Sequence, residues 1–319
     1  IVANVDEVGN KYGSYGMKFT QSKLAEVDQA LQRLNIFVQQ SSYGKAQLKW
    51  TTSGVYELGS GVCNNVSYGD KVNDLILRAL QAADSPNPLS DYSYYIIVHP
   101  MPDCSDGEQW SFEGRGDFVA YTLNGRVVRL RGIHISNLWD HYLFHEFGHS
   151  LAYQPNQPLG HPDYMNCPIT LSNSETQIAL SSTCPRVYDF YNGPIPVFTI
   201  MSALPGNLSD YNAIEKEIVG WLTGADIVPT SAGRYTLSPL EQVGSGPKAL
   251  KIPISGTDFN VYVSFRQPIG YTYPTTHANK PNGVILDITN GNNISDMHYL
   301  VTSNAKMDAP LQIGMSYRI

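Results

Sequence analysis

The sequence predicts an α+β protein with two domains, and three observations carry this prediction. Helix-like and strand-like hydrophobic patterns alternate along residues 1–224, whereas residues 225–319 contain only short strand patterns separated by Gly, Pro and Asn. Of the 319 residues, 42% are apolar, which is enough for a sizeable core. The length allows one large domain or two of ordinary size. We therefore expect an α+β domain over 1–224 and a small all-β sandwich domain over 225–319.

The first domain is expected to contain four helices and four strands. The first helix shows the pattern most clearly, because Leu24, Val27, Leu31, Leu34 and Val38 recur at helical spacing. A residue with a capping side chain, Thr20, precedes it. The predicted helices span 20–40, 70–83, 137–153 and 211–222, and the predicted strands span 1–5, 46–52, 94–98 and 127–135.

The second domain is expected to be built from short strands. Helical periodicity stops at about residue 225, and Gly, Pro and Asn punctuate the apolar runs that follow. The predicted strands span 234–237, 249–254, 261–266, 284–288 and 299–302. Short strands at this spacing are typical of a sandwich.

Composition and charge exclude two classes of partner. Charged residues make up only 15% of the chain, against about 25% in an average soluble protein, and the net charge is −7. A nucleic-acid-binding protein needs a basic surface, and a membrane span needs roughly 20 apolar residues in a row, so neither is expected. A low-charge surface rich in Tyr, Ser and Asn favours a secreted, extracellular protein, expected to be a monomer.

Four cysteines are present, and their even number in a low-charge chain indicates two disulfides. The candidates are Cys63, Cys104, Cys167 and Cys184, none in Cys-x-x-Cys spacing. We favour Cys167–Cys184, which closes a short loop, and therefore Cys63–Cys104. Four free thiols in a cytosolic protein remain the alternative.

One motif carries the chemistry: His145-Glu146-Phe147-Gly148-His149. Two histidines four residues apart lie on one face of a helix and can bind one zinc ion. Glu146 would lie beside the metal and serve as a general base toward a water molecule. By chance, a chain of this composition contains about 0.006 such motifs. The motif also lies in a predicted helix that follows a strand, with Ser136 as a candidate N-cap.

A catalytic zinc usually has three protein ligands, and the third is less clear. His161 is the preferred candidate, Asp163 is the nearest rival, and Glu175 is the third choice. His141 lies one helical turn before His145 and is expected to line the cleft rather than to bind the metal, since three such positions extend over two turns. His134 is expected to be structural or near the substrate path. A structural Ca²⁺ is a second metal expectation, without assigned ligands.

More of the chain resembles the gametolysin family of metzincin metallopeptidases and the related immune-inhibitor-A type. The resemblance rests on Ser42–Lys45, the zinc-binding motif, His161–Cys167, Cys184, Phe198–Ser202, Val219–Leu222 and Val261–Arg266. It implies a twisted mixed sheet with helices and an irregular C-terminal subdomain in the first domain. It also implies that Met201 lies in the Met-turn, under the metal. Two positions depart from the metzincin pattern: Ala152 replaces a Gly, and Pro155 stands where the third ligand is expected.

The sequence therefore predicts a secreted zinc-dependent endopeptidase that cleaves polypeptides or glycoproteins. His145, His149 and His161 would hold the metal, and Glu146 would be the general base. The strand near 127–133 would form the rim of the cleft and pair with an extended substrate. Two alternatives stay open: an extracellular protein that binds a polymer or glycoprotein and has a silent or structural metal site, and a zinc hydrolase that acts on a non-peptide bond.

Overall fold

The computed structural model describes most of the chain and divides it into two compact units. The described residues are 1–6, 17–64, 68–84, 88–100, 114–123, 125–151, 199–201, 208–229, 233–244, 246–256, 258–271, 282–290 and 293–299. The first unit comprises residues 1–36 and 48–160, and the second comprises 37–47 and 161–319. Within the described residues, no helix is both long enough and apolar enough to cross a membrane.

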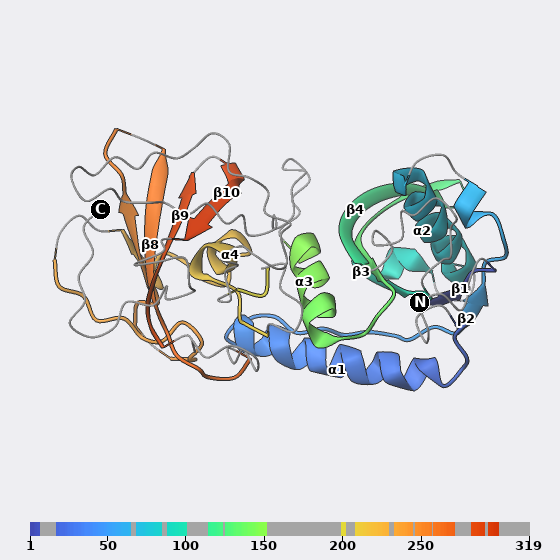
Figure 1. Cartoon of the computed structure of the whole chain (residues 1–319), viewed down its shortest axis with the longest axis horizontal. Helices are drawn as coiled ribbons and strands as arrows, with labels where there is room; N and C mark the ends of the chain where they lie inside the picture. Colours follow the sequence, from blue (N-terminus) through green and yellow to red (C-terminus); the bar gives the residue numbers. More distant parts are fainter. Residues whose placement is uncertain are drawn as a thin grey trace, which may run out of the picture. The chain divides into compact units, whose positions relative to one another are not determined.

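The first unit is built on a curled, five-stranded mixed sheet with the strand order β2-β1-β3-β5-β4 (Figure 1). Strands β2, β1, β3 and β5 run parallel to one another, and β4 pairs antiparallel with β5. The strands are β1 (Val2–Asn4), β2 (Val55–Glu57), β3 (Tyr94–Val98), β4 (Gly114–Leu123) and β5 (Arg126–Ile135). The α+β class is confirmed.

Two helices lie on opposite faces of this sheet. Helix α2 (Tyr68–Asp84) buries one stripe of side chains against alternate residues of the strands, among them Tyr95 and Ile97 of β3. Side chains alternate along a strand, so Tyr94 and Ile96 point to the opposite face of the sheet. There Tyr94 contacts Phe147 of α3 (Asp140–Leu151), with ring centroids 5.2 Å apart. The buried α2 stripe consists of Val72, Leu75, Ile76, Ala79 and Leu80.

Helix α1 (Lys23–Ser41) begins in the first unit and ends in the second. The predicted strand over 46–52 is wrong: this segment has no strand partner, and the strand lies further on, at β2. Polar side chains of α1 form hydrogen bonds with residues of segment 46–52 instead. The Leu48 N–H donates to Asn35 Oδ1 at 2.7 Å, and the Trp50 indole N–H donates to Asp28 Oδ1 at 3.2 Å.

The second unit contains a five-stranded sheet with the order β10-β9-β8-β7-β6, antiparallel except for the β6–β7 pair. Its strands are β6 (Ile227–Pro229), β7 (Ala249–Pro253), β8 (Phe259–Arg266), β9 (Gly283–Asn290) and β10 (Asn293–Tyr299). The described residues form this one sheet rather than two facing sheets. The predicted strand over 234–237 has no ladder partner. Of the strand predicted over 299–302, only Tyr299 lies within the described residues, where it ends β10.

The short helix α4 (Ala213–Ile218) packs on this sheet. Ala213 and Ile214 share a buried cluster with side chains of the loops and strands that follow: Leu222, Ile227, Leu240, Ala249, Tyr262 and Ile285. This packing explains why the compact units divide near residue 160 rather than near 224. The helix predicted at 211–222 supplies part of the core beneath the sheet that follows it in the chain.

A buried polar network ties the end of α1 into the second unit. Lys216 is fully buried and lies 2.5 Å from Asp210 Oδ2, while the Ser41 hydroxyl donates to Asp210 Oδ1 at 2.6 Å. Lys216 also donates to the Tyr43 hydroxyl at 3.3 Å, and that hydroxyl donates to the Leu240 carbonyl at 2.5 Å. These bonds satisfy the hydroxyl groups of Ser41 and Tyr43 within this unit.

Candidate metal centre

Helix α3 carries the metal-binding motif and begins directly after the loop that leaves β5. The predicted N-cap, Ser136, does not start the helix. The Asn137 side chain accepts a hydrogen bond from the Trp139 N–H at 2.7 Å, and the helix runs from Asp140. Arg33 of α1 lies 2.7 Å from the Asp140 carboxylate, which fixes this first turn to the neighbouring helix.

The buried side of α3 packs against strands β4 and β5, and Tyr94 of β3 also contacts it. Phe144 and Phe147 are buried, and Tyr94 packs on Phe147. The Tyr94 hydroxyl bonds Ser150, whose hydroxyl also donates to the Phe147 carbonyl at 2.7 Å. Arg131 of β5 donates to the Leu151 carbonyl at 3.4 Å near the C-terminal end of the helix. These contacts fix the rotation of α3 and so determine which side chains face outward.

His145, Glu146 and His149 converge at one point on α3. Their potential ligand atoms lie within 4.8 Å of one another, and both histidines are half-buried. The two Nε2 atoms are 3.0 Å apart, with the rings nearly perpendicular. Two nitrogens bound to one tetrahedral zinc at 2.0–2.1 Å lie about 3.3 Å apart, so the donor set fits a zinc ion. The arrangement offers two imidazole ligands and an adjacent carboxylate.

The negative charge of Glu146 affects the pKa of Tyr94, which packs behind helix α3. Tyr94 is half-buried, and its pKa is raised well above the usual value, first by desolvation and then by the negative charge of Glu146. The phenol therefore stays neutral and keeps its hydrogen bond to Ser150. Sequence reasoning did not identify Tyr94, Ser150 or Arg131 as supports of the site; the alternation along the predicted strand 94–98 was the available signal for Tyr94.

His141 lies on the same helix but outside the metal-binding group found among the described residues. Its ring stacks at a tilt on Tyr142, with centroids 4.2 Å apart, and lies 5.8 Å from Trp139. Burial, together with the positive charge of His145, lowers its pKa to about 4. His141 is therefore neutral near pH 7, and its expected place in the lining of the cleft stays a prediction.

His134 is a core residue. It lies near the end of β5, fully buried, and its Nδ1 is 3.1 Å from Nε2 of His99, which follows β3. His99 Nδ1 lies 2.8 Å from the Pro100 carbonyl and donates to it. Nε2 of His99 is then the acceptor, and His134 Nδ1 carries the proton that joins the rings. The sequence suggested no partner for His99.

Several predicted site residues lie outside the described residues: the third-ligand candidates His161, Asp163 and Glu175, and the cysteines Cys104, Cys167 and Cys184. Their roles stay predictions. Cys63 is disulfide-bonded, and the predicted pairing stays a prediction as well. The structure does describe Met201: it is fully buried in a turn of the second unit, and its N–H donates to the Thr199 hydroxyl at 3.2 Å.

The strand that was expected to pair with a substrate is β5, and β5 is an interior strand of the sheet. Strand β5, which covers 127–133, is hydrogen-bonded to β3 on one side and to β4 on the other. An interior strand has no unpaired edge to offer. Among the described strands of the first unit, β4 lies at the edge next to β5, and α3 packs against both. Sequence patterns did not predict β4.

Comparison with protein-family models and with curated proteins finds no match to this chain.

Proposed function

We propose that this protein is a zinc-dependent endopeptidase of the metzincin type, secreted to act on extracellular proteins. One observation carries the proposal: two imidazole Nε2 atoms 3.0 Å apart and a carboxylate converge on one half-exposed surface of a helix. A purely structural zinc has no use for a carboxylate base beside it. The resemblance of the sequence to gametolysin-like peptidases supports the choice of peptide bonds over other bonds.

Each residue of the motif on α3 would have a separate role in catalysis. His145 and His149 would hold the zinc, with His161 as the expected third ligand. When bound, the zinc would polarise the scissile carbonyl and lower the pKa of the attacking water. Glu146 would accept a proton from that water and pass it to the leaving amine. Because His145 and His149 are held by the same helix that carries Glu146, all three groups are placed by the packing of α3 on the sheet.

The outer edge of β4 is the candidate for binding an extended substrate. An edge strand presents unpaired N–H and C=O groups that a peptide can satisfy by adding as a further strand. The helix α3 contacts β4, so a peptide on this edge would run near the helix that carries the proposed metal ligands.

Replacement of Glu146 by glutamine tests the function. The amide keeps the shape of the side chain but cannot take a proton, so cleavage of casein or gelatin should fall at least 100-fold while bound zinc, measured by elemental analysis, stays at one per chain. His149→Ala should lose both zinc and activity, and His141→Ala should keep zinc. Full activity of Glu146→Gln, or cleavage by the wild type that a chelator leaves unchanged, would contradict the proposal.

A further inference from the structure

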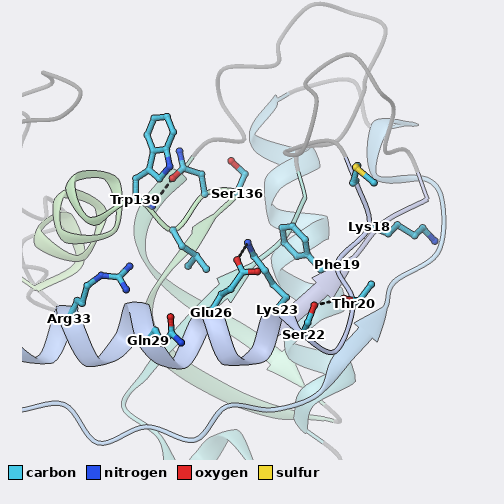
Figure 2. A pocket seen from close by; sticks show the side chains of 13 residues that line it. Lys18, Phe19, Thr20, Ser22, Lys23, Glu26, Gln29, Arg33, Ser136 and Trp139 are labelled. Atoms are coloured by element: carbon cyan, nitrogen blue, oxygen red, sulfur yellow. Dashed lines mark hydrogen bonds and ion pairs between the residues drawn. The ribbon is translucent and has the colours of Figure 1, made fainter.

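A pocket of about 510 Å³ lies in the first unit, between the N-terminal half of α1 and the loop that joins β5 to α3 (Figure 2). Each of the three cations on its lining, Lys18, Lys23 and Arg33, is paired with a carboxylate of the protein. Figure 2 also shows the indole of Trp139 turned away from α1. The lining of this pocket therefore indicates no particular class of ligand.

The second unit contains a buried carboxyl group, that of Glu215 in α4, which contacts two segments of the chain. Glu215 Oε2 accepts a hydrogen bond from the Thr199 hydroxyl at 2.6 Å and another from the Asn212 N–H at 2.6 Å. The Asn212 side chain in turn accepts from the Glu215 N–H at 2.9 Å, which completes a capping box at the start of α4. The same carboxyl oxygen therefore caps α4 and binds the turn at residues 199–201.

The hydrogen bonds of this turn lead from Met201 to Glu215. The Met201 N–H can only donate, and its acceptor is the Thr199 hydroxyl at 3.2 Å. The hydroxyl has one proton, which it donates to Glu215 Oε2. Thr199, Ile200 and Met201 are all buried, so bulk water does not replace a lost partner at low cost. The position of Met201 thus depends on an acceptor at Glu215.

The carboxyl group of Glu215 is neutral at pH 7. Burial, followed by the negative charge of Asp287 on β9, raises its pKa to about 8, although the hydrogen bonds from Thr199 and Asn212 and the positive charge of Arg266 on β8 oppose this rise. Oε2 accepts both hydrogen bonds, so the proton belongs on Oε1, which is buried and has no hydrogen-bond partner among the described residues. A glutamine has the same shape and the same acceptor but cannot ionise. Glu215→Gln should therefore reproduce the neutral carboxyl group.

We propose that Glu215 is the positioning residue of the turn at 199–201 and holds Met201 in place through the Thr199 hydroxyl. This inference rests on the proposed function, in which the resemblance to metzincins makes Met201 the base of the metal site. Glu215 itself would touch neither the metal nor the substrate. Helix α4 also packs through Ala213 and Ile214, so removal of the acceptor should displace the turn without unfolding the unit.

Nuclear magnetic resonance of the full-length chain tests this role without relying on catalysis. The protein contains seven methionines, and ¹³C labelling of their methyl groups gives one signal for each, with Met201→Leu assigning that of Met201. We expect Glu215→Leu and Thr199→Val to shift the Met201 signal, because both remove the hydrogen bond between the turn and α4. Glu215→Gln should leave the signal in place at pH 7, because the amide oxygen still accepts both hydrogen bonds.

A matched control lies on the same helix. The Glu217 carboxylate binds Lys251 and Tyr262 rather than the turn, so Glu217→Leu should keep the Met201 signal of the wild type. In hydrolysis of a short peptide, kcat should fall about tenfold in Glu215→Leu with KM unchanged, and Glu215→Gln should restore it. Thr199→Val removes only a hydroxyl and provides the same test if Glu215→Leu does not fold.

Three results would overturn the proposal: a wild-type Met201 signal in Thr199→Val, a signal displaced as far in Glu215→Gln as in Glu215→Leu, or an equal displacement in Glu217→Leu. A wild-type protein that cleaves no peptide would contradict the proposed function instead. The methyl signals decide the role of Glu215 in that case as well, because they require neither zinc nor proteolysis.

Discussion

His145 and His149 face each other on the half-exposed side of α3, whereas His99 and His134 are paired in the buried interior of the same unit. The two pairs have similar N–N distances but different surroundings. The first pair is accessible to a metal ion and has Glu146 beside it. The second pair has the Pro100 carbonyl at one end, which orders the protons of both rings. Surroundings rather than spacing therefore separate a candidate metal site from a core contact.

The buried pair makes stability depend on pH. Burial lowers the pKa of His99 from 6.5 to about 4, so between these values the unfolded chain binds a proton that the folded chain does not. The free energy of unfolding should therefore fall as the pH drops from 6.5 to 4, by about 3 kcal/mol from this group. His99→Gln should flatten this part of the curve in urea titrations at each pH. An unchanged slope in the variant would contradict the assignment.

At the scale of elements, a glycine in β5 leaves room for an aromatic ring of the neighbouring strand β3. Gly132 of β5 lies opposite Tyr95 of β3, and a Cβ atom at position 132 would be 2.5 Å from the Tyr95 ring. Tyr95 is buried in the cluster beneath α2. Glycine is thus required here by close approach and not by backbone conformation.

Gly132→Ala should lower the free energy of unfolding by about 1–3 kcal/mol, because the ring or the strand must move. Gly54→Ala is the matched control, since a Cβ atom there meets nothing within 4 Å. Chemical denaturation of both variants compares them directly. Equal stabilities of the two variants would show that Tyr95 yields without cost.

At the scale of the whole molecule, a buried ion pair forms hydrogen bonds with residues that lie far away in the chain. Lys216 of α4 and Asp210 bind Ser41, the last residue of α1, and Tyr43, which follows the helix, inside the second unit. Burial disfavours the charge of Lys216, while Asp210 favours it. Such a pair is costly to break from one side, because the remaining charge stays buried without a partner.

Lys216→Met should destabilise the protein by about 3–5 kcal/mol, whereas Lys216→Met combined with Asp210→Asn should recover part of that loss. Urea unfolding of the single and double variants measures both values. A double variant no more stable than Lys216→Met would show that the lost packing, rather than the unpaired carboxylate, causes the effect.

Residue patterns determined most of the local structure. The helical spacing in α1 and α2, the apolar run of β3 and the His145–His149 motif each result from neighbours a few residues apart, so the sequence predicts them directly. Strand pairing is different, because a strand exists only where a partner binds it. Residues 48–52 looked strand-like but are bonded by α1 side chains, and β4 was missed although it pairs along its whole length with β5.

The sequence by itself determined the chemistry of the candidate metal site, since one helical turn contains two imidazoles and a carboxylate. The tertiary structure decided what surrounds that turn: the anchoring of α3 by Tyr94 and Arg131, the edge position of β4, and the pocket beside Trp139. It also placed the division of the chain near residue 160, because α4 packs on the sheet that follows it. The physical reason is the range of the interactions. Helix periodicity is local, whereas pairing, burial and pocket walls join residues that the sequence keeps far apart.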